Sequence, residues 1–533
     1  MTPRSILLIH PPVSKPCEAP AGPAKLALAL RSRGVDCRVY DAGLDGLLGL
    51  LERPLTARDK WTRRALAHRQ ANVAALRSAR LYSNRDRYKR AVMDLNRAVQ
   101  AAGNPFNTSL SLSNYGAPDL SPVRSRDLIR SAEHFEFNPF FGVFSEHLAA
   151  LFEQRQPGVI GVSINFMSQA LCAFAMIGFI RRQLPRATIV CGGGLVTSWM
   201  TIPDIGNPFA GLVDELVAGP GEKRLIALCS GDRSSAVGLT GADFSTADLD
   251  RYLSPLRVLP YAASRGCYWK KCAFCPETAE DAPYRSANPG TILADLRQAV
   301  HQTSAGLVHF LDNALSPRLL EHLGAHPPGV PWYGFARVTP HLADPGFVMD
   351  LKKSGCRMLK LGLESGDQRV LDALHKGTSV HTAAQALEAL HRAGITTYAY
   401  LLFGTPAEDE TSALKTLDFT LRHAACIDFL NLAIFNLPAT GREAASLDTG
   451  DFYKGDLSLY REFTHPRGWG RSRVRHFLNH VFKKPAAIRA ILNHDPPFFT
   501  SNHAPFMPPQ RGLQPVGSLG RHQVYRRARI SKG

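Results

Sequence analysis

Short apolar segments alternate with helical segments between residues 255 and 440, and this alternation constrains the fold of the chain more than any other feature. The helical segments carry apolar residues at helix spacing, as Thr382–Ala393 does with Ala384, Leu387 and Leu390. Repeats of strand and helix build parallel sheets. The pattern predicts strands at 257–264, 307–311, 332–336, 358–363, 396–403 and 429–434. Six such repeats predict a partial (β/α)6 barrel of the TIM type.

Three cysteines, Cys267, Cys272 and Cys275, lie in one loop directly after the first of these strands. Three thiolates are too many for one nucleophile and too few for a four-thiolate site. A 4Fe–4S cube held by three protein ligands keeps one iron open for another molecule. The alternative is a structural zinc knuckle with a distant fourth ligand. The long series of strands and helices that follows the loop favours the iron–sulfur cluster.

Polar or flexible residues stand where the predicted barrel strands end, which is where the reactive groups of such barrels gather. The residues are Asp312, Arg337, Glu364, Ser365, Gly404 and Pro406. Three of them have other readings, which the sequence leaves open. Asp312 is also suited to cap the next helix, Arg337 to pair with a structural acid, and Glu364 to stand as a surface carboxylate.

The first part of the chain predicts a second parallel sheet. Strand patterns at 5–10, 37–41, 159–163, 187–191 and 212–218 alternate with helical patterns at 22–33 and 168–183. An Arg- and Ala-rich insert at about 50–150 reads as a helical elaboration that packs over this sheet. Glycines follow the later strands, at 192–194, 219 and 221, where an open sheet lets a ligand approach the backbone.

Composition limits the classes of protein that fit. The 533 residues suggest three or four domains, and ten cysteines of which three cluster suggest a metal and a reducing cytoplasm rather than a disulfide framework. No apolar run is long enough to cross a membrane. The net charge of +18 is spread over 52–100, 461–475 and 521–532, so we do not expect a nucleic acid partner.

These patterns give a division of the chain into four parts. We expect a Rossmann-like domain at 1–235, a barrel at 250–440, a small and mostly helical region at 441–510, and a basic, disordered tail at 511–533. Within the third part, Tyr460–His480 reads as a basic helix.

The cysteine loop resembles that of the radical S-adenosylmethionine (SAM) superfamily, as does the segment Leu361–Asp372 with Lys376 after it. That family usually has three residues between its first two cysteines, whereas this chain has four. The resemblance implies a 4Fe–4S cluster on Cys267, Cys272 and Cys275, with SAM on the open iron and an external electron donor of the flavodoxin or ferredoxin type. It implies SAM contacts from Phe274, Asp312, Arg337, Glu364, Ser365, Gly404 and Pro406.

The N-terminal part, about residues 4–230, resembles the cobalamin-binding domain of one radical SAM subclass. The residues that would then lie at cobalamin are Pro11, Pro12, Ser163, Asn165, Gly192, Gly193, Gly194, Gly219, Gly221 and Glu222. The Asp-x-His-x-x-Gly motif of histidine-ligating cobalamin domains is absent from the sequence. The resemblance therefore implies cobalamin without a histidine from that motif on the metal.

The first functional hypothesis is cobalamin-dependent methylation of an unactivated carbon in a small-molecule substrate. A second is a radical cyclisation or rearrangement without methyl transfer. A third is RNA methylthiolation. That reaction needs a second cluster on N-terminal cysteines, and Cys17 and Cys37 are only two. A non-catalytic cobalamin-binding sensor is the fourth, and it has no need of the three clustered cysteines.

Overall fold

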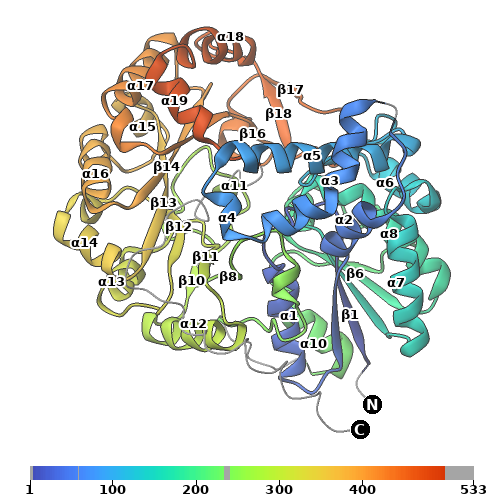
Figure 1. The fold of residues 1–533 in the computed structure, drawn as a ribbon. Helices are drawn as coiled ribbons and strands as arrows, with labels where there is room; N and C mark the ends of the chain where they lie inside the picture. Colours follow the sequence, from blue (N-terminus) through green and yellow to red (C-terminus); the bar gives the residue numbers. More distant parts are fainter. Residues whose placement is uncertain (1–3, 58, 233–239, 498–533) are drawn as a thin grey trace.

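The structure, a computed structural model, describes residues 4–57, 59–232 and 240–497. Two parallel sheets lie side by side, each flanked by helices, and the last helices lie over the far end of the second sheet (Figure 1). This arrangement confirms the predicted α/β fold with a Rossmann-like part followed by a partial barrel. The predicted tail at 511–533 lies outside the described residues.

The N-terminal sheet has five parallel strands. In spatial order they are β2 (Cys37–Asp41), β1 (Ile6–His10), β5 (Val159–Ser163), β6 (Thr188–Gly192) and β7 (Glu215–Leu216). The flanking helices are α1 (Ala21–Arg31), α8 (Met167–Gln183), α9 (Gly194–Trp199) and α10 (Glu222–Ser230). Every residue of β1 is buried, which its continuous apolar run requires. The strand predicted at 212–218 is shorter, since only two of its residues pair with β6.

The insert between β2 and β5 is helical, as predicted, with one small hairpin. Its elements are α2 (Ala42–Glu52), α3 (Lys60–Leu76), α4 (Ala79–Tyr82), α5 (Arg85–Gly103), β3 (Ser109–Leu110), β4 (Tyr115–Gly116), α6 (Ser125–Glu133) and α7 (Phe141–Gln154). It also reaches the other half of the molecule. Lys89 Nζ donates to the Asn493 carbonyl at 2.6 Å, and the guanidinium of Arg85 lies 6.0 Å from the ring of Phe429. The insert therefore bridges the two sheets (Figure 1).

The second sheet has six parallel strands in sequential order, as a partial barrel requires. They are β8 (Val258–Tyr261), β11 (Leu307–Phe310), β12 (Trp332–Ala336), β13 (Cys356–Glu364), β14 (Thr396–Phe403) and β15 (Phe429–Ile434). Its helices are α12 (Pro289–Thr303), α13 (Pro317–Ala325), α14 (Pro345–Lys353), α15 (Gln368–Ala373), α16 (Val380–Ala393) and α17 (Glu410–Arg422). Serine, asparagine or aspartate caps the start of each, and this fixes where each strand-to-helix loop ends.

The C-terminal region differs from its predicted form at one point. A three-stranded sheet is made by β16 (Leu437–Pro438), β18 (Tyr460–Phe463) and β17 (Thr449–Asp451), and α18 (Arg471–Phe477), a π-helical turn (Leu478–Phe482) and α19 (Ala486–His494) follow. The helix predicted over Tyr460–His480 was wrong in its first half. Residues 460–463 pair with two other strands, and Gly468 with φ +64° turns the chain before the helix begins.

None of the helices in the described part of the chain has both the length and the apolar character that crossing a bilayer needs.

Candidate active site

The cysteine loop leaves the barrel between β8 and α12. Two short antiparallel strands, β9 (Ser264–Arg265) and β10 (Arg285–Ser286), close its base, and α11 (Pro276–Ala279) follows the third cysteine. Gly266 has φ +71°, and a Cβ there would lie 2.9 Å from the Pro283 carbonyl oxygen, so glycine is required where the loop opens. All three thiols are free.

The four-residue spacer between the first two cysteines is anchored on the barrel. Trp269 Nε1 donates to the His375 carbonyl at 2.9 Å, and the indole fills the space that a side chain on Gly377 would need. The guanidinium of Arg337 stacks on the same indole, 3.8 Å from the ring centroid. The additional spacer residue therefore lies in a region of the loop that docks against the 374–377 turn.

The three thiols are residues of the type that binds an iron–sulfur cluster. Burial raises the pKa of Cys272, while Lys376 and Arg337 work to lower it. Burial also raises the pKa of Cys275, to about 11. Within the described residues, no three His, Cys, Asp or Glu side chains converge on a single metal ion. A cube does not need such convergence, because its three thiolates bind three different irons. Cluster ligation would hold these cysteines as thiolates beside two cations.

Glu364 forms a buried ion pair at the end of β13. Its carboxylate lies 2.7 Å from Lys376 Nζ, and both side chains stand over Gly362, where a Cβ would lie 2.6 Å from each. Burial works to lower the pKa of Lys376, but Glu364 and Cys272 together raise that pKa above its ordinary value. The Lys376 ammonium also lies 5.6 Å from the ring of Phe274. Lys376 thus lies beside Phe274 of the cysteine loop and also pairs with Glu364, a residue predicted to contact SAM.

Asp312 and Arg337 both face the cysteine loop. Asp312 accepts hydrogen bonds from the Ala263 amide at 3.0 Å and from the Ser264 hydroxyl, so it holds the start of the loop, and Ser316 caps the following helix in its place. Burial raises the pKa of Asp312. Arg337 donates to the Lys376 carbonyl and pairs with no acid within the described part of the chain. Within the described residues, Asp312 therefore does not cap the next helix and Arg337 does not pair with an acid.

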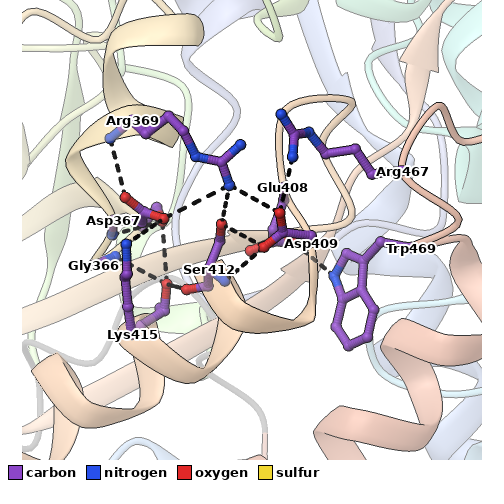
Figure 2. Close-up of polar contacts among 11 residues, drawn as sticks. Gly366, Asp367, Arg369, Glu408, Asp409, Ser412, Lys415, Arg467 and Trp469 are labelled. Atoms are coloured by element: carbon purple, nitrogen blue, oxygen red, sulfur yellow. Dashed lines mark hydrogen bonds and ion pairs between the residues drawn. The ribbon is translucent and has the colours of Figure 1, made fainter.

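Ser365, Gly404 and Pro406 lie in the turns that follow β13 and β14. The Ser365 hydroxyl lies 3.1 Å from that of Thr416 on α17, so its side chain packs against a helix. Gly404, with φ +79°, donates its amide to Glu408. Figure 2 shows the network around these turns, in which Arg369 and Arg467 share Asp409 at 3.1 and 3.0 Å.

A cavity of about 550 Å³ lies between the N-terminal sheet and the cysteine loop. Eight of the ten residues predicted for cobalamin line it: Ser163, Asn165, Gly192, Gly193, Gly194, Gly219, Gly221 and Glu222. Pro11 and Pro12 do not. They are buried beside it, where Gln169 Nε2 donates to the Pro11 carbonyl at 2.8 Å. The sequence thus predicted one wall of a real cavity.

The opposite wall comes from the cysteine loop, which sequence reasoning missed. It includes Arg265, Glu277, Glu280 and Arg285. Glu280 accepts from the Ser198 hydroxyl at 2.5 Å, and burial raises its pKa. Glu277 Oε2 is buried and has no hydrogen-bond partner within the described residues. A buried acceptor of this kind costs free energy unless a ligand satisfies it. The motif Cys275-Pro-Glu277 was the only signal in the sequence.

The lining of this cavity lets a ligand approach the backbone and offers it charged groups. Glycines on the sheet side allow close approach to the backbone, and Gly193 has φ +104° with a Cβ position 2.5 Å from the Ile164 carbonyl. Burial lowers the pKa of Lys25, another lining residue, to about 8. No histidine lines the cavity among the described residues.

Comparison with known proteins identifies the class of this site. The family model of the radical SAM superfamily matches residues 261–420, which contain the three cysteines and most of the barrel strands. Residues 261–420 therefore match a radical SAM domain. This superfamily uses a 4Fe–4S cluster and SAM.

Two curated proteins show sequence similarity. Bacteriochlorophyllide d C-12(1)-methyltransferase of Chlorobaculum tepidum is 27% identical over 180 residues, which cover 31% of this chain and 38% of that protein. Anaerobic magnesium-protoporphyrin IX monomethyl ester cyclase of Cereibacter sphaeroides is 27% identical over 177 residues, 32% of this chain and 28% of that protein. The chain thus spans about a third of the length of these relatives.

The fold as a whole resembles one solved enzyme. The radical SAM methyltransferase TsrM of Kitasatospora setae, with cobalamin and a [4Fe-4S] cluster bound, superposes with a TM-score of 0.54 at 16% identity over 93% of this chain and 92% of that one. The same enzyme with tryptophan and a SAM analogue gives 0.55 at 16% identity over 92% and 90%. The chain therefore shares its overall fold with that enzyme.

Proposed function

We propose that this chain is a cobalamin-dependent radical SAM enzyme that methylates an unactivated carbon of a small-molecule substrate. The observation that carries the proposal is the wall shared by the glycine-lined cavity and the cysteine loop. Glu277 lines the cavity and follows Cys275 by two residues. A cofactor in the cavity would lie next to the cluster loop, as transfer between two cofactors and one substrate requires.

In this proposal the chain's own residues hold and orient the reactants. Cys267, Cys272 and Cys275 bind the cluster, while Glu364 and Lys376 present a buried, hydrogen-bonded carboxylate beside Phe274 for SAM. Asn165 accepts from the Gly194 amide at 3.0 Å and keeps the sheet side of the cavity open. When bound, the cluster and SAM supply a carbon-centred radical and cobalamin supplies a methyl group.

The first experiment tests the cluster and SAM cleavage. Anaerobically reconstituted protein should bind about four irons and four sulfides and form 5′-deoxyadenosine from SAM when reduced. Cys267→Ala, Cys272→Ala and Cys275→Ala should each abolish both. The control Cys356→Ala should keep the cluster, because that thiol is buried in the barrel core at β13. Stoichiometric zinc without sulfide would contradict the assignment.

The second experiment tests the SAM site. Glu364→Ala should weaken SAM binding in an equilibrium titration and leave the iron content unchanged, since Glu364 is not a cluster ligand. Unchanged SAM affinity would remove Glu364 from the site. The Glu364→Ala, Lys376→Met double variant separates SAM contact from the effect of an unpaired buried ammonium.

The third experiment tests methyl transfer. The protein with cobalamin bound is incubated with its substrate and with SAM that carries a labelled methyl group. The label should appear in the product made from that substrate. A radical cyclisation is the second candidate, favoured by the similarity to a curated cyclase. It predicts 5′-deoxyadenosine with no label in the product.

A further inference from the structure

A second cavity, of about 290 Å³, lies at the carboxyl end of the barrel, beneath the C-terminal region. Gly404 and Asn436, which follow β14 and β15, form its floor. Its other walls come from Phe452, which follows β17, from Arg461 of β18, and from Arg471 and Arg473 in the first turn of α18. The mouth of a barrel of this type is where substrates bind.

Arg471 is held in place by neutral groups. Its Nη1 donates to Asn436 Oδ1 at 2.7 Å and to the Phe435 carbonyl at 3.3 Å, and its guanidinium lies 4.9 Å from the ring centroid of Phe452. It makes no ion pair within the described residues. Burial lowers the pKa of Arg471. An oriented guanidinium without an acid is a group that a ligand carboxylate would satisfy.

The remaining charges of the cavity also favour an anion. Arg461 pairs with Asp451 only at 3.4 Å and at an exposed position, and the exposed Arg473 has no acid partner within the described part of the chain. Glu462 is the single carboxylate among the lining residues. His465 donates Nε2–H to the Thr405 carbonyl at 2.9 Å and accepts two backbone amides at Nδ1, so it is held neutral.

Apolar surface surrounds these guanidinium groups. Phe435 and Phe463 pack edge to face with ring centroids 5.8 Å apart, and Ile434 also lines the cavity. SAM does not account for the positive charge, because its carboxylate belongs on the cluster side in the proposed arrangement and its adenosine end is uncharged.

We infer that this cavity binds a carboxylate group of the organic substrate, with the apolar body of that substrate against the phenylalanines. The inference rests on the proposed function, because it names the substrate class of the same active site. It places Arg471 as the residue that positions the substrate below the C-terminal region.

Fluorine NMR tests the inference with two matched probes, 4-fluorophenylacetate and its neutral isostere 4-fluorophenylacetamide. The full chain with cluster and SAM bound should broaden the carboxylate signal in a saturable way and the amide signal much less. Arg471→Gln should weaken carboxylate binding by about tenfold, the loss expected for one charge-assisted pair. Arg471→Lys, which keeps the charge without the planar fork, should fall between the two.

Arg475→Gln is the matched control, since Arg475 is exposed on the same helix and does not line the cavity. It should bind the carboxylate as the unmodified chain does. Equal binding of both probes, no binding of either, or an equal loss in Arg475→Gln would each overturn the inference. Formation of 5′-deoxyadenosine by the unmodified chain is measured in the same samples, so a failure of the proposed function is seen separately.

Discussion

Residues of the site that end a strand could be predicted from the sequence. Contacts that form only when the chain folds back on itself could not. Glu364 ends β13, so the barrel rule found it. Its partner Lys376 lies twelve residues later, after α15, and only the folded turn brings the two within 2.7 Å. Glu277 was missed because nothing in Cys-Pro-Glu shows that its carboxylate faces the N-terminal sheet. The type and position of a residue in the sequence identify it as a candidate for the site. Its burial and its bonding partners in the folded chain then indicate its role.

Glu408 shows how burial sets a property that sequence cannot. It has no exposed surface, accepts from the Gly404 amide and from Trp469 Nε1 at 3.1 Å, and leaves Oε1 unpartnered within the described residues (Figure 2). Burial raises its pKa from 4.5 to about 8, against the hydrogen bond from Gly404. The folded chain therefore keeps this proton at neutral pH, where the unfolded chain releases it.

The predicted consequence is a loss of stability with rising pH. Between the two pKa values, 4.5 and about 8, the folded state binds more protons than the unfolded state, so the free energy of unfolding falls as pH rises. The contribution approaches about 1.4 kcal/mol per pH unit within that window. Glu408→Gln should remove it, and the exposed Glu410→Gln should not. Urea unfolding across this pH range measures the slopes, and equal slopes for the unmodified chain and Glu408→Gln would contradict the prediction.

At the scale of elements, the pattern of apolar residues predicted the strands that pair with the next strand along the chain. The barrel strands pair in sequential order, so alternating apolar runs located them to within a few residues, as in Thr396–Phe403. β18 was missed because its partners, β16 and β17, are short strands, and their pairing with β18 has no local pattern in the sequence. The reach of the insert was also missed, since Lys89 and Asn493 are 404 positions apart. Contacts of that range leave no periodic trace in a sequence.

Close packing of elements gives a prediction at Gly178 of α8. A Cβ there would lie 1.9 Å from the carbonyl oxygen of Ala132 on α6, which is backbone and cannot move aside. Gly178→Ala should force the two helices apart and lower the free energy of unfolding by about 1–3 kcal/mol, as overpacking does. Gly450→Ala, with nothing within 4 Å of its Cβ position, is the control and should be close to neutral. Denaturant unfolding compares them, and equal stability of the two variants would show that α6 and α8 do not approach this closely.

At the scale of the whole molecule, the carboxyl ends of the N-terminal sheet face the cysteine loop of the barrel. The sequence supplied both halves of this arrangement but not their juxtaposition, because the cavity walls come from residues 8–26 and 161–225 on one side and from 265–285 on the other. The contact of Arg265 with buried Glu222 joins the two walls. A cofactor held by the first part is thereby brought to the chemistry of the second.

The juxtaposition leads to the last prediction, which concerns the metal ligand of bound cobalamin. No histidine lines the cavity among the described residues, and the nearest candidate by sequence, His10, is buried against Ser14 and Gln169 instead. The reduced Co(II) form should therefore show no nitrogen superhyperfine splitting from the protein in its electron paramagnetic resonance spectrum.

Cobinamide, which lacks the cofactor's own base, makes the test specific, because any splitting must then come from a side chain. His10→Asn should leave the spectrum unchanged. A triplet splitting with cobinamide would show that a nitrogen of the protein reaches the cobalt and would contradict the prediction. Failure to bind either corrinoid would remove methyl transfer in favour of the radical cyclisation.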